Sequence, residues 1–173
     1  MVGEVRDAET AQICMRAALT GHFVLSTLHT NDALAAVTRL ADMDIEPFLL
    51  ASTLRVVVAQ RLIRRLCEHC KQPYELDEET AKRVGLQFGG TLYRPTGCAE
   101  CREAGYKDRV GVFEVIRITP ELADMIQRRS SLPEMRKASV AQGMKLLYHS
   151  ALDKVLAGRT SVEEALSVTI SEA

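Results

Sequence analysis

Four of the five cysteines in this chain form two closely spaced pairs, and this spacing is typical of a metal site. Two residues separate the cysteines of each pair, so both sulfurs of a pair can face one ion, and four thiolates can close a tetrahedral shell around Zn²⁺. A closed shell leaves no position open for a substrate, so the ion would be structural and not catalytic. The predicted ligands are Cys67, Cys70, Cys98 and Cys101.

Two disulfides, or four unrelated buried thiols, are the alternatives to a metal site. We favour zinc because disulfides are rare in a reducing cytoplasm. His69 lies inside the first pair and could replace one cysteine, but with four cysteines present we expect it to be a surface residue. Cys14, the fifth cysteine, lies on the apolar face of a predicted helix, and we interpret it as a core residue.

The cysteine spacing also fits a stand-alone zinc-ribbon module that binds nucleic acid or protein. Basic residues lie beside the first pair, but aromatic side chains are few and the chain contains no Trp. The net charge of −1 gives no general attraction to nucleic acid or to anionic membranes. We therefore expect no nucleic-acid partner and interpret the basic cluster as a solvated helix end or a subunit contact. The cluster consists of Arg61, Arg64, Arg65 and Lys71.

A second set of residues suited to chemistry follows two short apolar segments. Glu4 follows the first, and an ionised carboxylate at the end of a buried strand can orient a water for attack on a phosphate. Arg6 could pair with Glu4 or with a phosphate. His29 follows the apolar run 22–28, at the edge where open α/β sheets bind ligands. If the two strands are parallel neighbours, Glu4 and His29 meet at one rim; the alternative is that the acid only caps the next helix.

The elements that must position these residues alternate between helix and strand, which predicts an α/β layered domain. Residues 8–20 show a helical pattern, and the apolar run 22–28 is typical of a buried strand. Another helix is expected after an N-cap at Thr30 or Asn31.

The rest of the chain predicts further helices around a loop-rich segment. Apolar residues at every fourth position predict one helix over residues 47–66, with Pro47 in its first turn. Residues 67–101 are loop-rich, and 105–118 predict a strand. Three helices are expected to follow, starting at Thr119-Pro120, at Ser131 with Glu134, and at Ser161 with Glu164.

The composition is that of a globular protein, with 173 residues of which 47% are hydrophobic and 26% charged. The longest apolar runs are shorter than the roughly 20 residues that a membrane span needs. The N-terminus lacks the basic and apolar segments of a signal peptide. These features predict a cytoplasmic protein.

Together the motifs resemble the traffic ATPases of the secretion superfamily, which are the motors of type II secretion and of type IV or MSHA-type pilus assembly. The segment "GEVRDAETA" resembles the Walker B segment of that family, and "GHFVLSTLHTNDA" resembles its histidine box. "QRLIRRLCEHCKQPY" and "TGCAEC" resemble its tetracysteine zinc insert, which retraction motors lack. "GYKDRVGVFEVI" and "AGRTSVEEAL" resemble its C-terminal helical subdomain.

The resemblance implies a role for each candidate residue. Glu4 would be the Walker B glutamate that acts on the attacking water, and His29 would sense or stabilise the γ-phosphate. The four paired cysteines would bind Zn²⁺. Residues 1–64 would be the C-terminal part of a RecA-like ATPase domain, 65–107 the zinc module and 108–173 the helical subdomain.

The resemblance also implies an assembly. The whole enzyme would be a homo-hexamer, peripheral to the inner membrane at its cytoplasmic face. Its partners would be the inner-membrane platform and cytoplasmic adaptor proteins. The zinc module could staple the fold or dock such a partner.

One motif that such a motor needs is missing from this sequence. A P-loop reads G-x-x-x-x-G-K-[S/T], and the chain contains no Gly-Lys pair. We therefore expect this chain to be the C-terminal part of a longer enzyme and to be inactive alone. The full-length protein would bind ATP and Mg²⁺.

Overall fold

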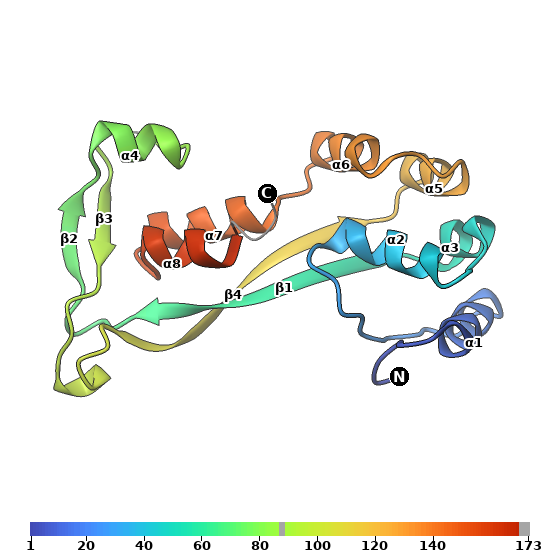
Figure 1. Cartoon of the computed structure of the whole chain (residues 1–173), viewed down its shortest axis with the longest axis horizontal. Helices are drawn as coiled ribbons and strands as arrows, with labels where there is room; N and C mark the ends of the chain where they lie inside the picture. The colour runs from blue at the N-terminus through green and yellow to red at the C-terminus, as the bar shows by residue number, and fades with distance from the viewer. Residues whose placement is uncertain (87–88, 170–173) are drawn as a thin grey trace. The chain divides into compact units, whose positions relative to one another are not determined.

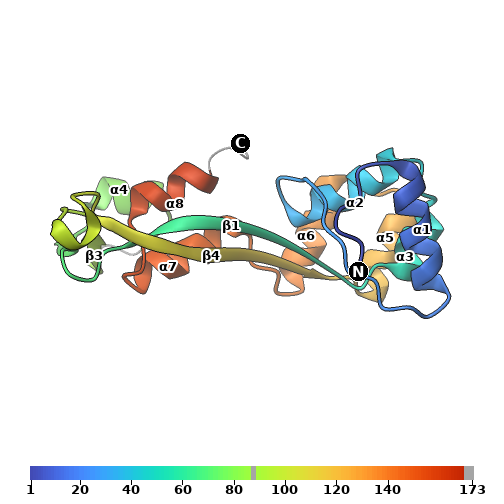
Figure 2. The same cartoon turned by 90° about the horizontal axis from the view of Figure 1, so that it is seen from below.

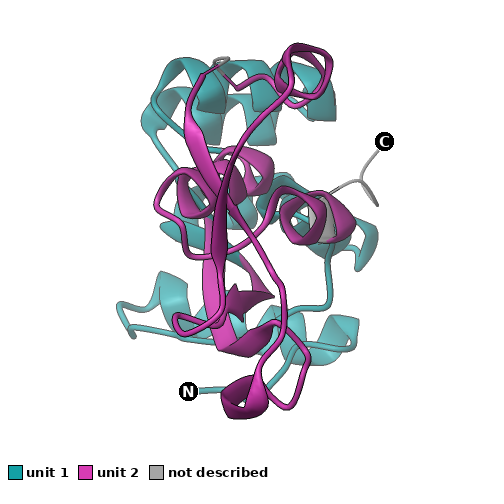
Figure 3. Ribbon diagram, turned by 90° about the vertical axis from the view of Figure 1, so that its left-hand side faces the viewer, with its two compact units in different colours: residues 1–59, 114–145 teal, residues 60–113, 146–173 magenta. Residues whose placement is uncertain are grey.

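The computed structural model describes residues 1–86 and 89–169, and it divides into two compact units (Figures 1 and 3). Unit 1 comprises residues 1–59 and 114–145, and unit 2 comprises residues 60–113 and 146–173. Each unit is assembled from two separate stretches of sequence. The three-part division with boundaries after residues 64 and 107 stays a prediction. None of the helices in the described ranges is both long and apolar enough to cross a bilayer.

The helices of unit 1 lie close to one another (Figure 2), and their buried side chains form one apolar core. α3 packs against α1, α2 and α5, and α6 packs against α2 and α5. Cys14, Leu34, Leu50, Leu122 and Met135 place one buried side chain from each helix in this core, as predicted for Cys14. α1 confirms the helix predicted at 8–20. The helices are α1 (Ala8–Leu19), α2 (Ala33–Asp42), α3 (Pro47–Thr53), α5 (Pro120–Gln127) and α6 (Leu132–Ala141).

The N-cap of α2 is Asp32, which corrects the predicted cap at Thr30 or Asn31. The Asp32 carboxylate accepts a hydrogen bond from the Ala35 N–H at 2.7 Å. The Thr30 hydroxyl instead donates to the Asp32 carbonyl oxygen at 3.1 Å. All three residue types can cap a helix, so composition alone does not select among adjacent candidates.

Residues 22–28 do not form the buried strand that their apolar run predicts. They run parallel to residues 1–5 and are joined to them by two backbone hydrogen bonds. These are Val2 N–H to Leu25 O and Val5 N–H to Thr27 O, both 2.9 Å. Val24 and Leu28 pack against the core, whereas Phe23 is 85% exposed. An apolar run with side chains on two faces is buried only when both faces are covered, and here the core covers one.

A strand follows α3 directly, which corrects the prediction of one helix over residues 47–66. α3 ends at Thr53, Leu54 has extended dihedral angles (φ −64°, ψ 135°), and β1 (Val56–Leu66) follows. Residues four positions apart share a face in a helix and also in a strand, so the four-residue recurrence does not separate the two. The β-branched run at 56–58 favours the strand.

β1 pairs with β4 (Tyr106–Arg117) in a two-stranded sheet, and β4 confirms the strand predicted at 105–118. The side chains of Val112, Glu114 and Ile116 are buried along β4, and the residues between them are exposed. This alternation is that of a half-buried strand. Glu114 is therefore a carboxylate in a row of buried apolar side chains.

Unit 2 combines a small antiparallel sheet with two C-terminal helices. β2 pairs with β3, with Gln72 opposite Arg94 and Glu75 opposite Thr91. α7 packs against α8 and contacts β3. The elements are β2 (Gln72–Glu75), α4 (Glu78–Arg83), β3 (Thr91–Arg94), the 3₁₀-helix η1 (Ala99–Cys101), α7 (Leu147–Leu156) and α8 (Val162–Thr169).

The capping signals at the later helices are confirmed in part, but the described residues after β4 form four helices and not the predicted three, because α7 begins at none of the predicted starts. The confirmed starts are Thr119 before α5 and the capping box of Ser131 with Glu134 before α6. At α8 only half of the predicted box forms. The Glu164 N–H donates to Ser161 Oγ at 3.2 Å, but the Glu164 carboxylate binds Arg64 instead. Arg64, which is distant in sequence, thus takes the place of the Ser161 N–H that the capping box predicts as the partner of the Glu164 carboxylate.

Candidate functional site

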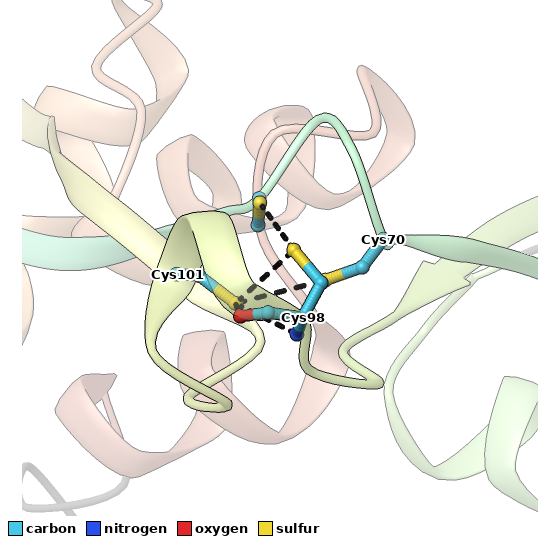
Figure 4. Close-up of side chains that lie close together, drawn as sticks. Cys70, Cys98 and Cys101 are labelled. Carbon is cyan, nitrogen blue, oxygen red and sulfur yellow. Dashed lines mark hydrogen bonds between the residues drawn. The ribbon is translucent and has the colours of Figure 1, made fainter.

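The four predicted metal ligands lie together in unit 2, and Figure 4 labels three of them, Cys70, Cys98 and Cys101. Their sulfur atoms all lie within 4.8 Å of one another. The Cys70–Cys101 and Cys98–Cys101 sulfurs are 3.8 Å apart, and the Cys67–Cys98 sulfurs are 3.9 Å apart. Four sulfurs about 2.3 Å from a central Zn²⁺ lie about 3.8 Å apart in a tetrahedron. The spacing therefore fits a zinc shell, and it is too long for the disulfide alternative, which needs about 2.05 Å. His69 is exposed and lies outside this group.

Two tight turns bring the sulfurs together, one after β1 and one around η1. In each turn a backbone N–H folds back onto the carbonyl of the first cysteine. These bonds are Lys71 N–H to Cys67 O at 3.0 Å and Glu103 N–H to Cys98 O at 2.9 Å. Gly105 ends the second turn with φ 74° and donates its N–H to the Cys101 sulfur at 3.2 Å. A Cβ at Gly105 would lie 2.4 Å from Pro95 Cβ, so the turn requires glycine there.

The thiols of this cluster differ in their readiness to ionise. Burial opposes ionisation of Cys70, but hydrogen bonds from the Gly97 backbone, the Thr96 hydroxyl and neighbouring thiols outweigh it and lower the pKa of Cys70 to about 7. A hydrogen bond from the Cys101 backbone favours the Cys98 thiolate, but burial and hydrogen bonding with the neighbouring thiols raise the pKa of Cys98 to about 11. Metal ligation requires thiolates, so an ion bound here would displace protons.

In unit 1 the structure brings Glu4 and His29 into contact. Glu4 Oε1 lies 3.0 Å from His29 Nε2, and Glu4 Oε2 lies 2.6 Å from Arg6 Nη2. The Glu4 side chain is 20% exposed, whereas Arg6 and His29 are mostly exposed. This contact is expected of parallel neighbouring segments, and the catalytic roles of Glu4 and His29 and the phosphate-binding role of Arg6 stay predictions.

Glu4 is held as a carboxylate and does not cap the following helix. The hydrogen bond from Arg6 is the strongest influence and lowers the pKa of Glu4, while the charges of Arg6 and His29 act in the same direction. The cap of α1 is Asp7, which accepts a hydrogen bond from the Thr10 N–H at 2.8 Å. The helix-capping alternative for Glu4 is therefore wrong.

An open cavity of about 240 Å³ adjoins this contact. Two arginines, one histidine and one glutamate line it, and guanidinium groups suit an anionic ligand such as a phosphate. Arg39, on α2, also lines a second cavity of about 370 Å³ and was not singled out by the sequence analysis. In the sequence, a basic residue in a mostly apolar helix that follows His29 is the feature that indicates Arg39 as a candidate for this site. The lining residues of the first cavity are Glu4, Val5, Arg6, Leu28, His29, Arg39 and Met43.

Comparison with known proteins identifies the family. Residues 1–167 match the family model described as Type II/IV secretion system protein. The chain belongs to this family. The resemblance to traffic ATPases that the sequence motifs indicate is thereby confirmed.

Two relatives illustrate how much of a whole protein the chain represents. It is 49% identical over 173 residues to type II secretion system protein E of Dickeya dadantii, covering 99% of this chain and 34% of the relative. It is 45% identical over 174 residues to the type IV pilus assembly ATPase PilB of Thermus thermophilus, covering 98% of this chain and 20% of the relative. The chain thus spans about a third or less of the length of these relatives. Their names do not favour the alternative of a stand-alone zinc ribbon.

Solved structures share the fold of this chain. The pilus retraction motor PilT with bound ADP is 21% identical with a TM-score of 0.65, covering 97% of this chain and 39% of that chain. The Legionella pneumophila ATPase DotB is 23% identical with a TM-score of 0.66, covering 100% of this chain and 38% of that chain. At these identities the likeness concerns the fold alone. The predicted α/β fold class, the later part of a RecA-like domain joined to a tetracysteine module and helices, is confirmed.

Proposed function

We propose that this chain is the C-terminal part of a hexameric traffic ATPase that couples ATP hydrolysis to assembly of a type II secretion pseudopilus or a type IV pilus. The observation that carries the proposal is the 3.0 Å contact between Glu4 and His29 beside an arginine-lined cavity. The family and the names of its members supply the reaction, because relatives of this chain are named as ATPases of pilus assembly and as type II secretion proteins.

In this proposal the Glu4 carboxylate orients the attacking water and accepts its proton. His29 contacts the γ-phosphate, and Arg6 contributes positive charge to phosphate binding. Bound Mg²⁺ would neutralise phosphate charge in the full-length enzyme, whose P-loop lies outside this chain. The four clustered cysteines would hold a structural Zn²⁺.

The proposed location is the cytoplasmic face of the inner membrane, to which the hexamer binds peripherally. Its partners there would be the membrane platform and cytoplasmic adaptor proteins of the secretion or pilus machine. The support is that relatives of this chain are named after these machines.

The Glu4→Gln variant of the full-length protein tests the catalytic role. Loss of a general base costs about 10²–10⁴-fold in rate, so phosphate release at saturating ATP should fall by at least about 100-fold while nucleotide binding persists. Glu9→Gln is the matched control, because Glu9 is exposed in the first turn of α1 and lies outside the cavity. Undiminished hydrolysis by Glu4→Gln would remove Glu4 from the mechanism. Turnover by the 173-residue chain alone would contradict the need for a P-loop elsewhere.

A further inference from the structure

Two buried carboxylates meet at the N-terminus of α2, directly after the loop that carries His29. Asp32 Oδ1 accepts a hydrogen bond from the Ala35 N–H at 2.7 Å, and Glu114 Oε1 accepts one from the Ala33 N–H at 3.0 Å. The first N–H groups of a helix have no partner inside the helix, and the helix dipole favours negative charge there. Both carboxylates thus satisfy amides at one helix end.

The second oxygen of Asp32 binds a residue from α6. Arg136 Nη2 lies 2.6 Å from Asp32 Oδ2, and the Arg136 side chain is 34% exposed. A hydrogen bond between two charged groups is stronger than a neutral one. The end of the 29–32 loop is therefore held from two sides. Arg136 on α6 binds the Asp32 side chain, and Glu114 on β4 binds the N–H of Ala33, directly after the loop.

Packing does not account for Glu114. Its neighbours on the same face of β4, Val112 and Ile116, are buried and apolar, and Glu114 itself is only 1% exposed. A buried carboxylate is unfavourable unless it is hydrogen-bonded, so an apolar residue would suit this face better. Asp32 caps α2 through the Ala35 N–H, so Glu114 serves a separate amide, that of Ala33, the first residue of the helix. What Glu114 and Arg136 share is the segment that they hold.

We propose that Glu114 and Arg136 are positioning residues that hold the 29–32 loop so that the His29 imidazole stays against Glu4. The proposal rests on the proposed function only in taking the Glu4–His29 contact as part of the catalytic site. Neither residue lines the cavity beside Glu4. Arg136 acts through the Asp32 side chain, and Glu114 acts through the backbone N–H of Ala33, which directly follows the loop.

A double-mutant cycle in the 173-residue chain tests this positioning role. The probe is the ¹⁵N chemical shift of His29 Nε2, assigned by comparison with His29→Gln. Glu4→Gln removes the charge 3.0 Å from this nitrogen and should shift its resonance. In an Arg136→Met background we expect Glu4→Gln to cause less than half of that shift, because the imidazole no longer stays against Glu4. Arg136→Lys, which keeps a cation within reach of Asp32, should restore most of it.

Arg128→Met is the matched control. It removes an exposed arginine–aspartate pair at the C-terminal end of α5, in which Arg128 Nη2 lies 2.7 Å from Asp124 Oδ2, and this pair is remote in sequence from the loop. It should leave the effect of Glu4→Gln at its wild-type size. An equally large effect in the Arg136→Met background, with the fold intact by circular dichroism, would overturn the role of Arg136. No nucleotide is present, so a full-length protein without ATPase activity would leave this result standing.

Glu114 is tested by amide hydrogen exchange. Glu114→Gln keeps an acceptor for the Ala33 N–H, whereas Glu114→Met keeps the length of the side chain and removes the acceptor. We expect Ala33 exchange to accelerate by about tenfold in Glu114→Met, as for the loss of one hydrogen bond, and to change little in Glu114→Gln. Equal rates of Ala33 amide exchange in both variants would exclude a positioning role for Glu114. If Glu114→Met does not fold, Glu114→Gln serves as the background for the His29 double-mutant cycle. If Glu4→Gln then shifts the His29 Nε2 resonance by less than half of the wild-type amount, accepting the Ala33 N–H hydrogen bond is not the whole role of Glu114.

Discussion

At the scale of single residues, the charge of Glu4 depends on Arg6. The Arg6 hydrogen bond lowers the pKa of Glu4, so replacing Arg6 by Met should raise that pKa toward the ordinary value of a glutamate. The measurement is the titration of the Glu4 carboxyl ¹³C resonance in the 173-residue chain. Arg16→Met, in the last turn of α1, should leave the midpoint in place. An unchanged midpoint in Arg6→Met would show that the ion pair does not persist in solution.

The residues of both sites differ in how far the sequence predicts them. Glu4 and His29 are predictable because each lies just after a short apolar segment, and the cysteines are predictable because ligand spacing is a local property. Arg39, Glu114 and Arg136 are not predictable in this way. Glu114 and Arg136 reach residues 32 and 33 from segments far along the chain, so no local pattern marks them.

At the scale of elements, Arg64 joins β1 to α8. The Glu164 carboxylate accepts hydrogen bonds from the Arg64 N–H at 2.8 Å, from Nε at 2.9 Å and from Nη2 at 2.6 Å. The Arg64 guanidinium also lies 4.2 Å from the centre of the Tyr106 ring, and the Tyr106 hydroxyl lies 2.8 Å from Ser161 Oγ. The side chains of Arg64, Tyr106, Ser161 and Glu164 thus form one cluster of contacts that joins strand β1, strand β4 and the start of α8.

Glu164→Gln should therefore destabilise the chain. The Glu164 side chain is 8% exposed while that of Arg64 is 57% exposed, so solvent screens part of the pair and we expect a loss of about 1–2 kcal/mol in the free energy of unfolding. Urea unfolding followed by circular dichroism measures it. Glu163→Gln is the matched control on the same helix, exposed and outside this cluster, with an expected change within about 0.5 kcal/mol. Equal stability of the two variants would contradict the assignment.

The same pair predicts a dependence on pH. Burial raises the pKa of Glu164, but the hydrogen bonds and charge of Arg64 outweigh it, so that the pKa lies below its ordinary value. A carboxylate with a lowered pKa in the folded state contributes stability above its unfolded pKa of about 4.3 and loses it as pH falls through the folded value. The difference in stability between wild type and Glu164→Gln should be present at pH 7 and shrink below about pH 4.

A helix or strand is hard to predict when the element that it pairs with lies far away in the sequence. Apolar residues at every fourth position fit either a helix or a strand over residues 54–66, and pairing with β4 decides for the strand. The backbone hydrogen bond from Ile118 N–H to Arg55 O at 2.9 Å is one contact that extends this pairing. The helix predicted at 8–20 needed no such information, because its caps and apolar face are local.

At the scale of the whole molecule, each unit combines segments from both halves of the chain. Unit 2 joins residues 60–113 with the C-terminal helices, so a sequence read from end to end does not show that α7 and α8 accompany the cysteines. The cysteine cluster itself was predictable because cysteine spacing is readable without the fold. Among the described residues of unit 2, much of the segment around these cysteines lacks regular secondary structure, and an ion would order it.

Removing the ion should therefore loosen the turns around the cysteines and leave the helices of unit 1 unchanged. We expect the purified chain to hold one Zn²⁺ per chain by elemental analysis, Cys101→Ser to lower this occupancy, and Cys14→Ser, a change outside the cluster, to retain it. Chelation should accelerate amide exchange at residues 67–71 and 98–105, because metal binding supplies the folding free energy of such turns, while α1 and α2 keep their protection. Full protection of residues 98–105 after the metal is removed would mean that the hydrogen bonds of the turns suffice. A chain that takes up no zinc would exclude the site.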